Sequence, residues 1–170
     1  MILSSSYIVI DDFLDEEILT TLIMYSEKLH FRDLSSTTAI RGRRSKRLNS
    51  IEPITSSKII KKFQSLDVFS AVNHFDLYLH KVYVGHFEKG YDIKTMAWHD
   101  DIGYNCAGVV YLNKTPESNS GTLLNIEGEV IGIENKFNRL AFYNSSILHR
   151  VENAFYSEAR PRLTLTIFAK

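Results

Sequence analysis

Residues 160–168 read RPRLTLTIF, and their alternation of apolar and polar side chains predicts a β-strand. The apolar face of this strand comprises Leu163, Leu165 and Ile167, and the opposite face comprises Arg160, Arg162, Thr164 and Thr166. If the apolar face packs under helices, the other face projects a guanidinium into the interior of a barrel. A buried guanidinium without a partner is costly, so that face should meet a carboxylate from the protein or from a ligand. The alternative is that Arg160 and Arg162 are solvated on an edge strand.

Similar segments fill the chain from His74 onward, where β-branched and aromatic residues alternate with polar ones. We expect strands near residues 76–84, 93–99, 106–113, 122–126, 130–134, 139–144, 146–152 and 162–169. Upstream, Asp15 and the acidic pair Glu16-Glu17 begin a helix that runs to about Leu29, and capping residues 55–57 precede a second helix over 58–66. This order predicts a mainly β fold with N-terminal helices, a β-sandwich or jelly roll with helices on one face.

Length and composition favour one domain. The chain has 170 residues, of which 44% are hydrophobic, enough for one substantial core. We expect a single domain over residues 1–170, with a helical region at about 11–70 and a β core at about 74–170. Lys+Arg and Asp+Glu both number 20, so no bulk electrostatic field argues for a nucleic-acid or membrane partner. A single cysteine, Cys106, and an N-terminus that resembles neither a signal peptide nor a membrane span favour the cytoplasm.

A pattern typical of metal ligands occurs at residues 98–101, which read WHDD. At the end of a strand, His99 and Asp101 point to the same side and Asp100 points away. His149 lies on a separate expected strand and can supply a third ligand. Two imidazoles and one carboxylate leave three positions of an octahedral ion open, which is the arrangement that non-haem Fe(II) oxygenases need. His-x-Asp is weak evidence by itself, because the chain has 6 histidines and many aspartates.

A basic segment at residues 41–47 reads RGRRSKR, and it lies in a stretch from Phe31 to Ser50 that has no clear period. We interpret this stretch as a mobile basic loop. It is either a solvated charge cluster or a lid that attracts an acidic peptide, a phosphorylated metabolite or nucleic acid.

Several motifs occur in the order found in one enzyme family. They are His99-Asp100-Asp101, residues 109–114 (VVYLNK), residues 120–123 (SGTL), residues 138–143 (NRLAFY), His149-Arg150-Val151, and Arg162 followed by residues 163–168. From about Leu79 onward, the chain resembles the catalytic domain of prolyl 4-hydroxylase-like Fe(II)/2-oxoglutarate dioxygenases. Residues 7–17 resemble the family's opening strand, turn and first helix. The resemblance implies a double-stranded β-helix, or jelly roll, packed against helices.

The resemblance also implies the residues of the metal site. His99, Asp101 and His149 match the iron ligands of the family. Arg162 matches the basic residue that pairs with the C5 carboxylate of 2-oxoglutarate.

Three further residues are candidates for the cosubstrate site. Tyr111 matches a tyrosine that reaches 2-oxoglutarate in some members, and its alternative is a strand aromatic in the core. Thr164 lies two residues beyond the arginine on the same face of the strand. The interval from His149 to Arg162 is longer than is usual in prolyl hydroxylases, so Arg160 competes for the cosubstrate carboxylate.

The implied cofactors are Fe(II) and 2-oxoglutarate with O2, and ascorbate is a further candidate. The implied reaction hydroxylates a prolyl or similar side chain of a protein or peptide and forms succinate and CO2. The alternatives are the same chemistry on a small molecule or nucleic-acid base, a non-catalytic jelly-roll binding module, and a zinc hydrolase that uses the same three ligands.

Overall fold

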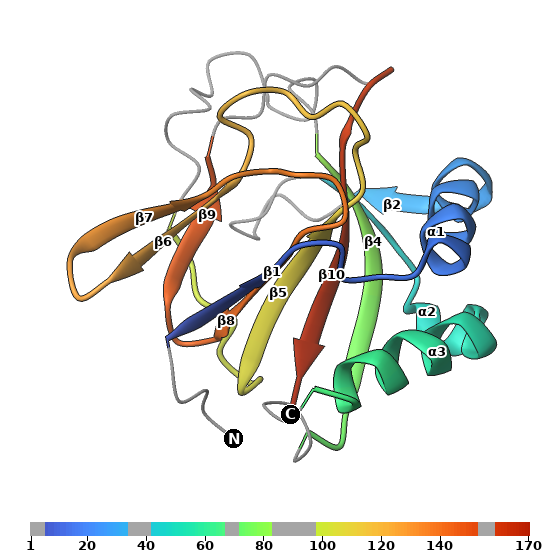
Figure 1. Cartoon of the computed structure of the whole chain (residues 1–170), viewed down its shortest axis with the longest axis horizontal. Helices are drawn as coiled ribbons and strands as arrows, with labels where there is room; N and C mark the ends of the chain where they lie inside the picture. Colours follow the sequence, from blue (N-terminus) through green and yellow to red (C-terminus); the bar gives the residue numbers. More distant parts are fainter. Residues whose placement is uncertain (1–5, 34–41, 67–71, 83–97, 153–158) are drawn as a thin grey trace.

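The computed structural model describes residues 6–33, 42–66, 72–82, 98–152 and 159–170, which form two antiparallel sheets and three helices (Figure 1). The larger sheet contains, in spatial order, β1 (Tyr7–Ile10), β8 (Leu140–Asn144), β5 (Cys106–Tyr111), β10 (Arg162–Ala169), β4 (Phe75–Val82), β3 (Arg43–Ser45) and β2 (Phe31–Asp33). The smaller sheet contains β7 (Glu129–Ile133), β6 (Thr122–Ile126) and β9 (Leu148–Val151). The expectation of a mainly β fold is confirmed.

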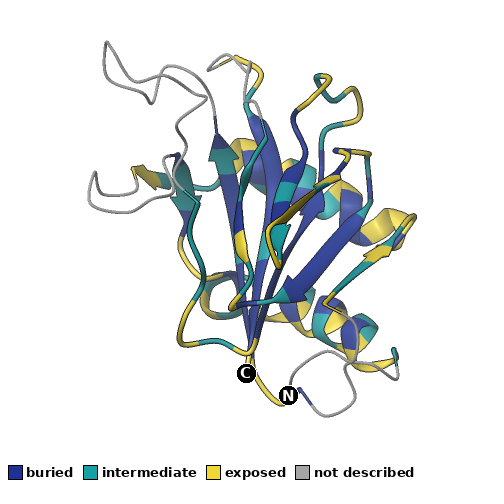
Figure 2. Ribbon diagram, turned by 90° about the vertical axis from the view of Figure 1, so that its left-hand side faces the viewer, coloured by how far each residue is buried: buried dark blue, intermediate teal, exposed yellow. Residues whose placement is uncertain are grey.

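Strand β10 lies in the middle of the larger sheet, between β4 and β5. Its residue Leu165 faces Leu79 on one side and Val110 on the other. These side chains point toward α1 (Glu16–Lys28), α2 (Leu48–Ile51) and α3 (Pro53–Gln64), which cover this face of the sheet (Figure 1). Figure 2 shows the sheet buried and the outer faces of the helices exposed. The apolar side of β10 therefore packs under the helices, as its alternation predicts.

The other face of β10 points toward the smaller sheet. Arg162 and Thr164 on this face are 2% and 1% exposed. A second apolar cluster lies between the two sheets and includes Tyr111, Leu124, Ile133, Tyr143 and Phe168. Because β10 is an interior strand, the alternative of a solvated Arg162 on an edge strand is wrong.

Most strand limits agree with the expected ones within two residues. β6 and β10 have the expected limits, Thr122–Ile126 and Arg162–Ala169. Most of the strand expected at residues 93–99 lies outside the described residues.

The interpretation of residues 31–50 as one loop is wrong for the residues that the structure describes. β2 and β3 pair with each other, β3 pairs with β4, and α2 follows. These short elements have no visible period because the pairing partner, β4, fixes them. Two arginines of the segment form ion pairs, since Arg43 Nε lies 2.9 Å from Asp33 Oδ1 and Arg47 Nη1 lies 2.7 Å from Asp76 Oδ1.

Both helix caps differ from expectation. Asp15 precedes α1 but its side chain makes no capping hydrogen bond, and its carboxylate lies 3.1 Å from Lys62 Nζ on α3. The second helix begins at Pro53 instead of near Lys58. Proline suits the first helical position because its missing N–H has no helical partner there.

Among the described residues, no helix has the length and apolar character needed to cross a membrane.

The packing of β10 under the helices predicts a large cost for truncating its central side chain. Leu165→Ala should lower the free energy of unfolding by about 2–5 kcal/mol, because Leu165 is 0% exposed and the removed atoms leave a cavity. Urea denaturation followed by circular dichroism measures this loss. Ile54→Ala is the matched control on α3, where Ile54 is 75% exposed, and its effect should stay within about 0.5 kcal/mol. Equal losses in the two variants would contradict the packing described above.

Candidate metal centre and adjoining pocket

A short antiparallel bridge brings His99 beside His149. The His99 N–H donates to the His149 carbonyl at 3.1 Å, and the His149 N–H donates to the His99 carbonyl at 2.8 Å. Residues that exchange both bonds project their side chains to the same side. The Asp101 N–H donates to the Ser145 carbonyl at 3.0 Å, which ties Asp101 to the turn before β9. The bridge therefore places the side chains of His99, Asp101 and His149 together.

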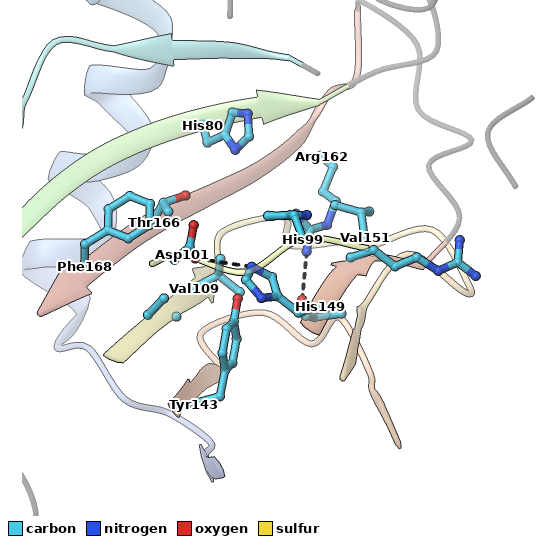
Figure 3. A pocket seen from close by; sticks show the side chains of 14 residues that line it. His80, His99, Asp101, Val109, Tyr143, His149, Val151, Arg162, Thr166 and Phe168 are labelled. Carbon is cyan, nitrogen blue, oxygen red and sulfur yellow. Dashed lines mark hydrogen bonds and ion pairs between the residues drawn. The ribbon is translucent and has the colours of Figure 1, made fainter. Parts of the chain in front are cut away.

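One ligand atom from each of these residues lies within 4.8 Å of the other two, and Figure 3 shows the cluster in the pocket. The Asp101 Oδ2 atom lies 3.3 Å from His149 Nε2, and the two imidazole centroids are 4.2 Å apart. His149 Nδ1 lies 2.9 Å from the Ile147 carbonyl oxygen. Since a carbonyl only accepts, Nδ1 carries a proton in this contact, and Nε2 is the nitrogen that faces Asp101 and would bind a metal ion. The expected convergence of the three side chains is thus present.

The pocket that contains this cluster runs between the two sheets. Its lining includes Arg162, Thr166 and Phe168 from β10, His80 from β4, Thr122 from β6 and Tyr143 from β8. In Figure 3, Thr166 and Phe168 lie to the left of the cluster, and His80 and Arg162 lie above it.

Arg162 is a buried cation that has no carboxylate partner among the described residues. Its Nε donates to the Ser120 carbonyl at 2.8 Å, and its Nη2 lies 3.4 Å from the Gly121 carbonyl and 3.3 Å from Thr122 Oγ1. Its guanidinium carbon lies 5.2 Å from the centroid of the Tyr111 ring. Neutral oxygens and an aromatic face fix the orientation of the guanidinium without neutralising its charge.

Tyr111 lies behind this arginine and not on the pocket surface. Its hydroxyl donates to Thr122 Oγ1 at 2.8 Å, and the same Oγ1 faces Arg162 Nη2. Burial raises the pKa of the Tyr111 hydroxyl, so this group stays protonated. Thr164 is also buried, 3.5 Å from the Thr166 hydroxyl, and of the two threonines it is Thr166 that lines the pocket.

Arg160 is not brought to this pocket. It is exposed, its Nη2 lies 3.3 Å from Thr115 Oγ1, and it lines a separate depression with Lys81 and Lys114. The sequence offers both Arg160 and Arg162 as partners of the cosubstrate carboxylate. Arg162 is the one that lines the pocket with His99, Asp101 and His149.

Several residues of the pocket were not expected from the sequence. Tyr143 packs against His149 with ring centroids 4.7 Å apart, and burial, reinforced by the charge of Asp101, raises the pKa of its hydroxyl well above the usual value. Thr122 lies within the motif at residues 120–123, and alternation along β6 is the signal that points it inward. No pattern in the sequence associates His80 with the candidate metal ligands.

A buried carboxylate anchors the turn that follows Asp101. The Tyr104 hydroxyl donates to Asp76 Oδ2 at 3.1 Å, and Arg47 donates to Asp76 Oδ1 at 2.7 Å. Burial alone would raise the pKa of Asp76, but the hydrogen bonds from Arg47 and Tyr104 outweigh it and lower the pKa. The Tyr104 N–H donates to the Asp101 carbonyl at 3.2 Å, and the Ser145 hydroxyl donates to the Tyr104 carbonyl. The backbone of Asp101 is therefore held at both ends of its turn.

Comparison with known proteins gives a structural match without a match in sequence. No protein-family model matches this chain, and no curated protein matches it significantly. A prolyl-4-hydroxylase from Pseudomonas putida is 14% identical, with a TM-score of 0.67 over 98% of this chain and 93% of that one. A Trichoplax adhaerens prolyl hydroxylase, solved with a hypoxia-inducible-factor peptide fragment, is 16% identical, with a TM-score of 0.67 over 98% and 84%.

The nogalamycin epimerase SnoN, solved in complex with Fe3+, α-ketoglutarate and nogalamycin RO, is 12% identical, with a TM-score of 0.69 over 96% of this chain and 78% of that one. Such low identities establish a common fold and leave the chemistry to be argued from the site. The chain therefore has the jelly-roll fold of prolyl hydroxylases and other 2-oxoglutarate-dependent iron oxygenases.

Proposed function

We propose that the protein is an Fe(II)- and 2-oxoglutarate-dependent dioxygenase and that the chain acts as one domain. One observation carries the proposal: a His-Asp-His cluster and a buried arginine without a carboxylate partner among the described residues line the same pocket. The cluster fits a metal ion, and the arginine fits an anion. A metal ion and a dicarboxylate that spans from it to a guanidinium are the two components that this chemistry requires.

The donor set suits ferrous iron. Two neutral imidazole nitrogens and one carboxylate oxygen occupy one side of an ion and leave the remaining positions to other ligands. His99, Asp101 and His149 would hold the ion, and the hydrogen bond from His149 Nδ1 to the Ile147 carbonyl orients one of the ligand rings. When bound, iron and 2-oxoglutarate supply the oxidising chemistry by which O2 yields succinate, CO2 and a hydroxylated substrate.

The chain's own residues bind and orient the cosubstrate. The guanidinium of Arg162 contacts Ser120 through Nε and Thr122 through Nη2. It would hold the distal carboxylate through its remaining N–H groups. Tyr111 would act through Thr122, and Thr164 through Thr166, since neither lies on the pocket surface. The apolar walls, including Val109, Tyr143 and Phe168, exclude water from the reacting groups.

For the substrate we propose a prolyl or similar side chain of a peptide. The supporting observation is that two of the similar structures are prolyl hydroxylases. The second candidate is a small molecule, because SnoN has a similar fold and was solved with a nogalamycin compound. Mass spectrometry of peptide and metabolite libraries would separate the two by a 2-oxoglutarate-dependent gain of one oxygen.

The first prediction concerns the carboxylate ligand. Anaerobic addition of Fe(II) and 2-oxoglutarate to the purified protein should give a weak visible charge-transfer band. Asp101→Ala should abolish this band and 2-oxoglutarate-dependent succinate formation, because it removes the anionic ligand. Asp100→Ala is the matched control and should retain both. Loss of both signals in Asp100→Ala alone would show that the wrong carboxylate is assigned, and metal-dependent hydrolysis without O2 would favour the zinc hydrolase.

The second prediction separates the two arginines. Arg162→Gln should raise the KM for 2-oxoglutarate about tenfold or more, because it removes a buried charged partner of the distal carboxylate. Arg160→Gln should leave that KM unchanged, because Arg160 lines a different depression. Thermal unfolding of both variants shows whether Arg162→Gln remains folded, and Arg162→Lys should recover part of the affinity. A KM increase in Arg160→Gln instead would reverse the assignment.

The third prediction concerns Tyr104 as a positioning residue for Asp101. Tyr104→Phe removes the hydrogen bond to Asp76 and should weaken Co(II) binding, measured through its visible absorption, about tenfold. Tyr25→Phe is the matched control, because it removes the hydroxyl that donates to Glu52 at 2.5 Å in the helical layer. Both variants should lose about 1 kcal/mol of stability, and only the first should lose metal affinity. Unchanged Co(II) affinity in Tyr104→Phe would refute the positioning role.

A further inference from the structure

A row of side chains leads from the edge of the larger sheet into the pocket. Arg32 on β2 faces Arg44 on β3, Arg44 faces His80 on β4, and His80 faces Thr164 on β10. Residues that face each other in antiparallel strands share one side of the sheet, so all four lie on the side where His80 lines the pocket. Neighbouring strands are about 5 Å apart, so Arg44 is one strand from the pocket lining and Arg32 is two.

The two arginines of this row differ from other arginines nearby. Arg44 is half-buried with its guanidinium carbon 4.7 Å from the centroid of the Tyr78 ring, and Arg32 is exposed. Neither forms a salt bridge with a residue in the described part of the chain. By contrast, Arg43 pairs with Asp33 and Arg47 pairs with Asp76. Arg44 and Arg32 thus present their positive charges on the side that faces the pocket.

One carboxylate, that of Asp76, lies on the same face of β4 as His80. Its oxygens are engaged by Arg47, His74 and the Tyr104 hydroxyl. It is therefore already engaged by other groups, and in the described part of the chain no carboxylate pairs with Arg44.

The aromatic rings beside the row favour one kind of anionic ligand over another. Tyr78 and Tyr104 both contact Phe168, with centroids 6.1 Å and 4.8 Å from its ring, and Phe168 lines the pocket. Arg44 lies over Tyr78, and Lys170 Nζ lies 4.9 Å from the Tyr104 centroid. Because cations and neighbouring rings already occupy these faces, they offer no platform for stacked nucleobases. The row therefore places positive charge beside the aromatic side chains of Tyr78, Tyr104 and Phe168.

We propose that Arg44 and Arg32 bind carboxylate groups of the substrate, and that the substrate is an acidic peptide lying across β4, β3 and β2 with its reacting residue in the pocket. This proposal rests on the proposed function for the reaction itself. The binding of the acidic groups is separate from the metal site and does not need the ion. A carboxylate two or three residues away from the reacting residue would reach Arg44 and then Arg32.

Fluorescence anisotropy of the metal-free full chain tests the binding step alone. The probes are a labelled peptide with one proline between two runs of three glutamates, its glutamine counterpart, free glutamate as a competitor, and a labelled oligothymidylate. The acidic peptide should bind, the glutamine peptide should bind at least tenfold more weakly, and added salt should weaken the binding of the acidic peptide. Competition by free glutamate as strong as that of unlabelled acidic peptide would point to a small carboxylate and overturn the peptide assignment.

The variants use two neighbouring arginines on opposite faces of β3. Arg44→Gln should weaken acidic-peptide binding about fivefold to tenfold, and Arg44→Lys should retain most of it. Arg43→Gln should leave it unchanged, because Arg43 faces away from the pocket and pairs with Asp33. Equal losses in Arg43→Gln and Arg44→Gln, equal affinity for the two peptides, or tighter binding of the oligothymidylate would each overturn the proposal. If the acidic peptide binds but Fe(II) and 2-oxoglutarate give no succinate, the dioxygenase function would be rejected. The assignment of Arg44 and Arg32 as a binding surface for acidic peptides would still stand.

Discussion

The pair of backbone hydrogen bonds between His99 and His149 is the constraint on which the site depends. It joins two segments that are far apart in the sequence and sets their ring centroids 4.2 Å apart. A further backbone hydrogen bond, from the Asp101 N–H to the Ser145 carbonyl, holds the carboxylate beside the two rings. Backbone geometry thus preorganises the three candidate ligands, and the side chains need only adopt suitable rotamers.

Features that follow from alternation along one strand were predictable from the sequence. The two faces of β10 could be assigned because Leu163 and Leu165 differ in character from Arg162 and Thr164. The same two-residue period distinguishes Asp101 from Asp100 at the metal-ligand cluster. Both inferences need only the local geometry of an extended chain, which the residue order records directly.

Features that depend on pairing between distant segments were not predictable. Arg160 and Arg162 are two residues apart and point to the same side of an extended chain. Only the position of β10 between β4 and β5 buries Arg162. β3 has three residues and no period, so its place beside β4 comes from the register and not from propensity. The contact of Tyr104 with Asp76 likewise joins residues that nothing in the sequence associates.

The charges of the pocket are a physical argument for the dianionic cosubstrate that we propose. Asp101 and Arg162 act in opposite directions on the buried hydroxyl of Tyr143, since the first raises its pKa and the second lowers it. If His99, Asp101 and His149 hold a ferrous ion as proposed, the ion would more than neutralise Asp101 and leave one excess positive charge. The guanidinium of Arg162 is a second positive charge in the same pocket. A molecule with two carboxylates neutralises both charges, whereas a monoanion would leave one of them buried and uncompensated.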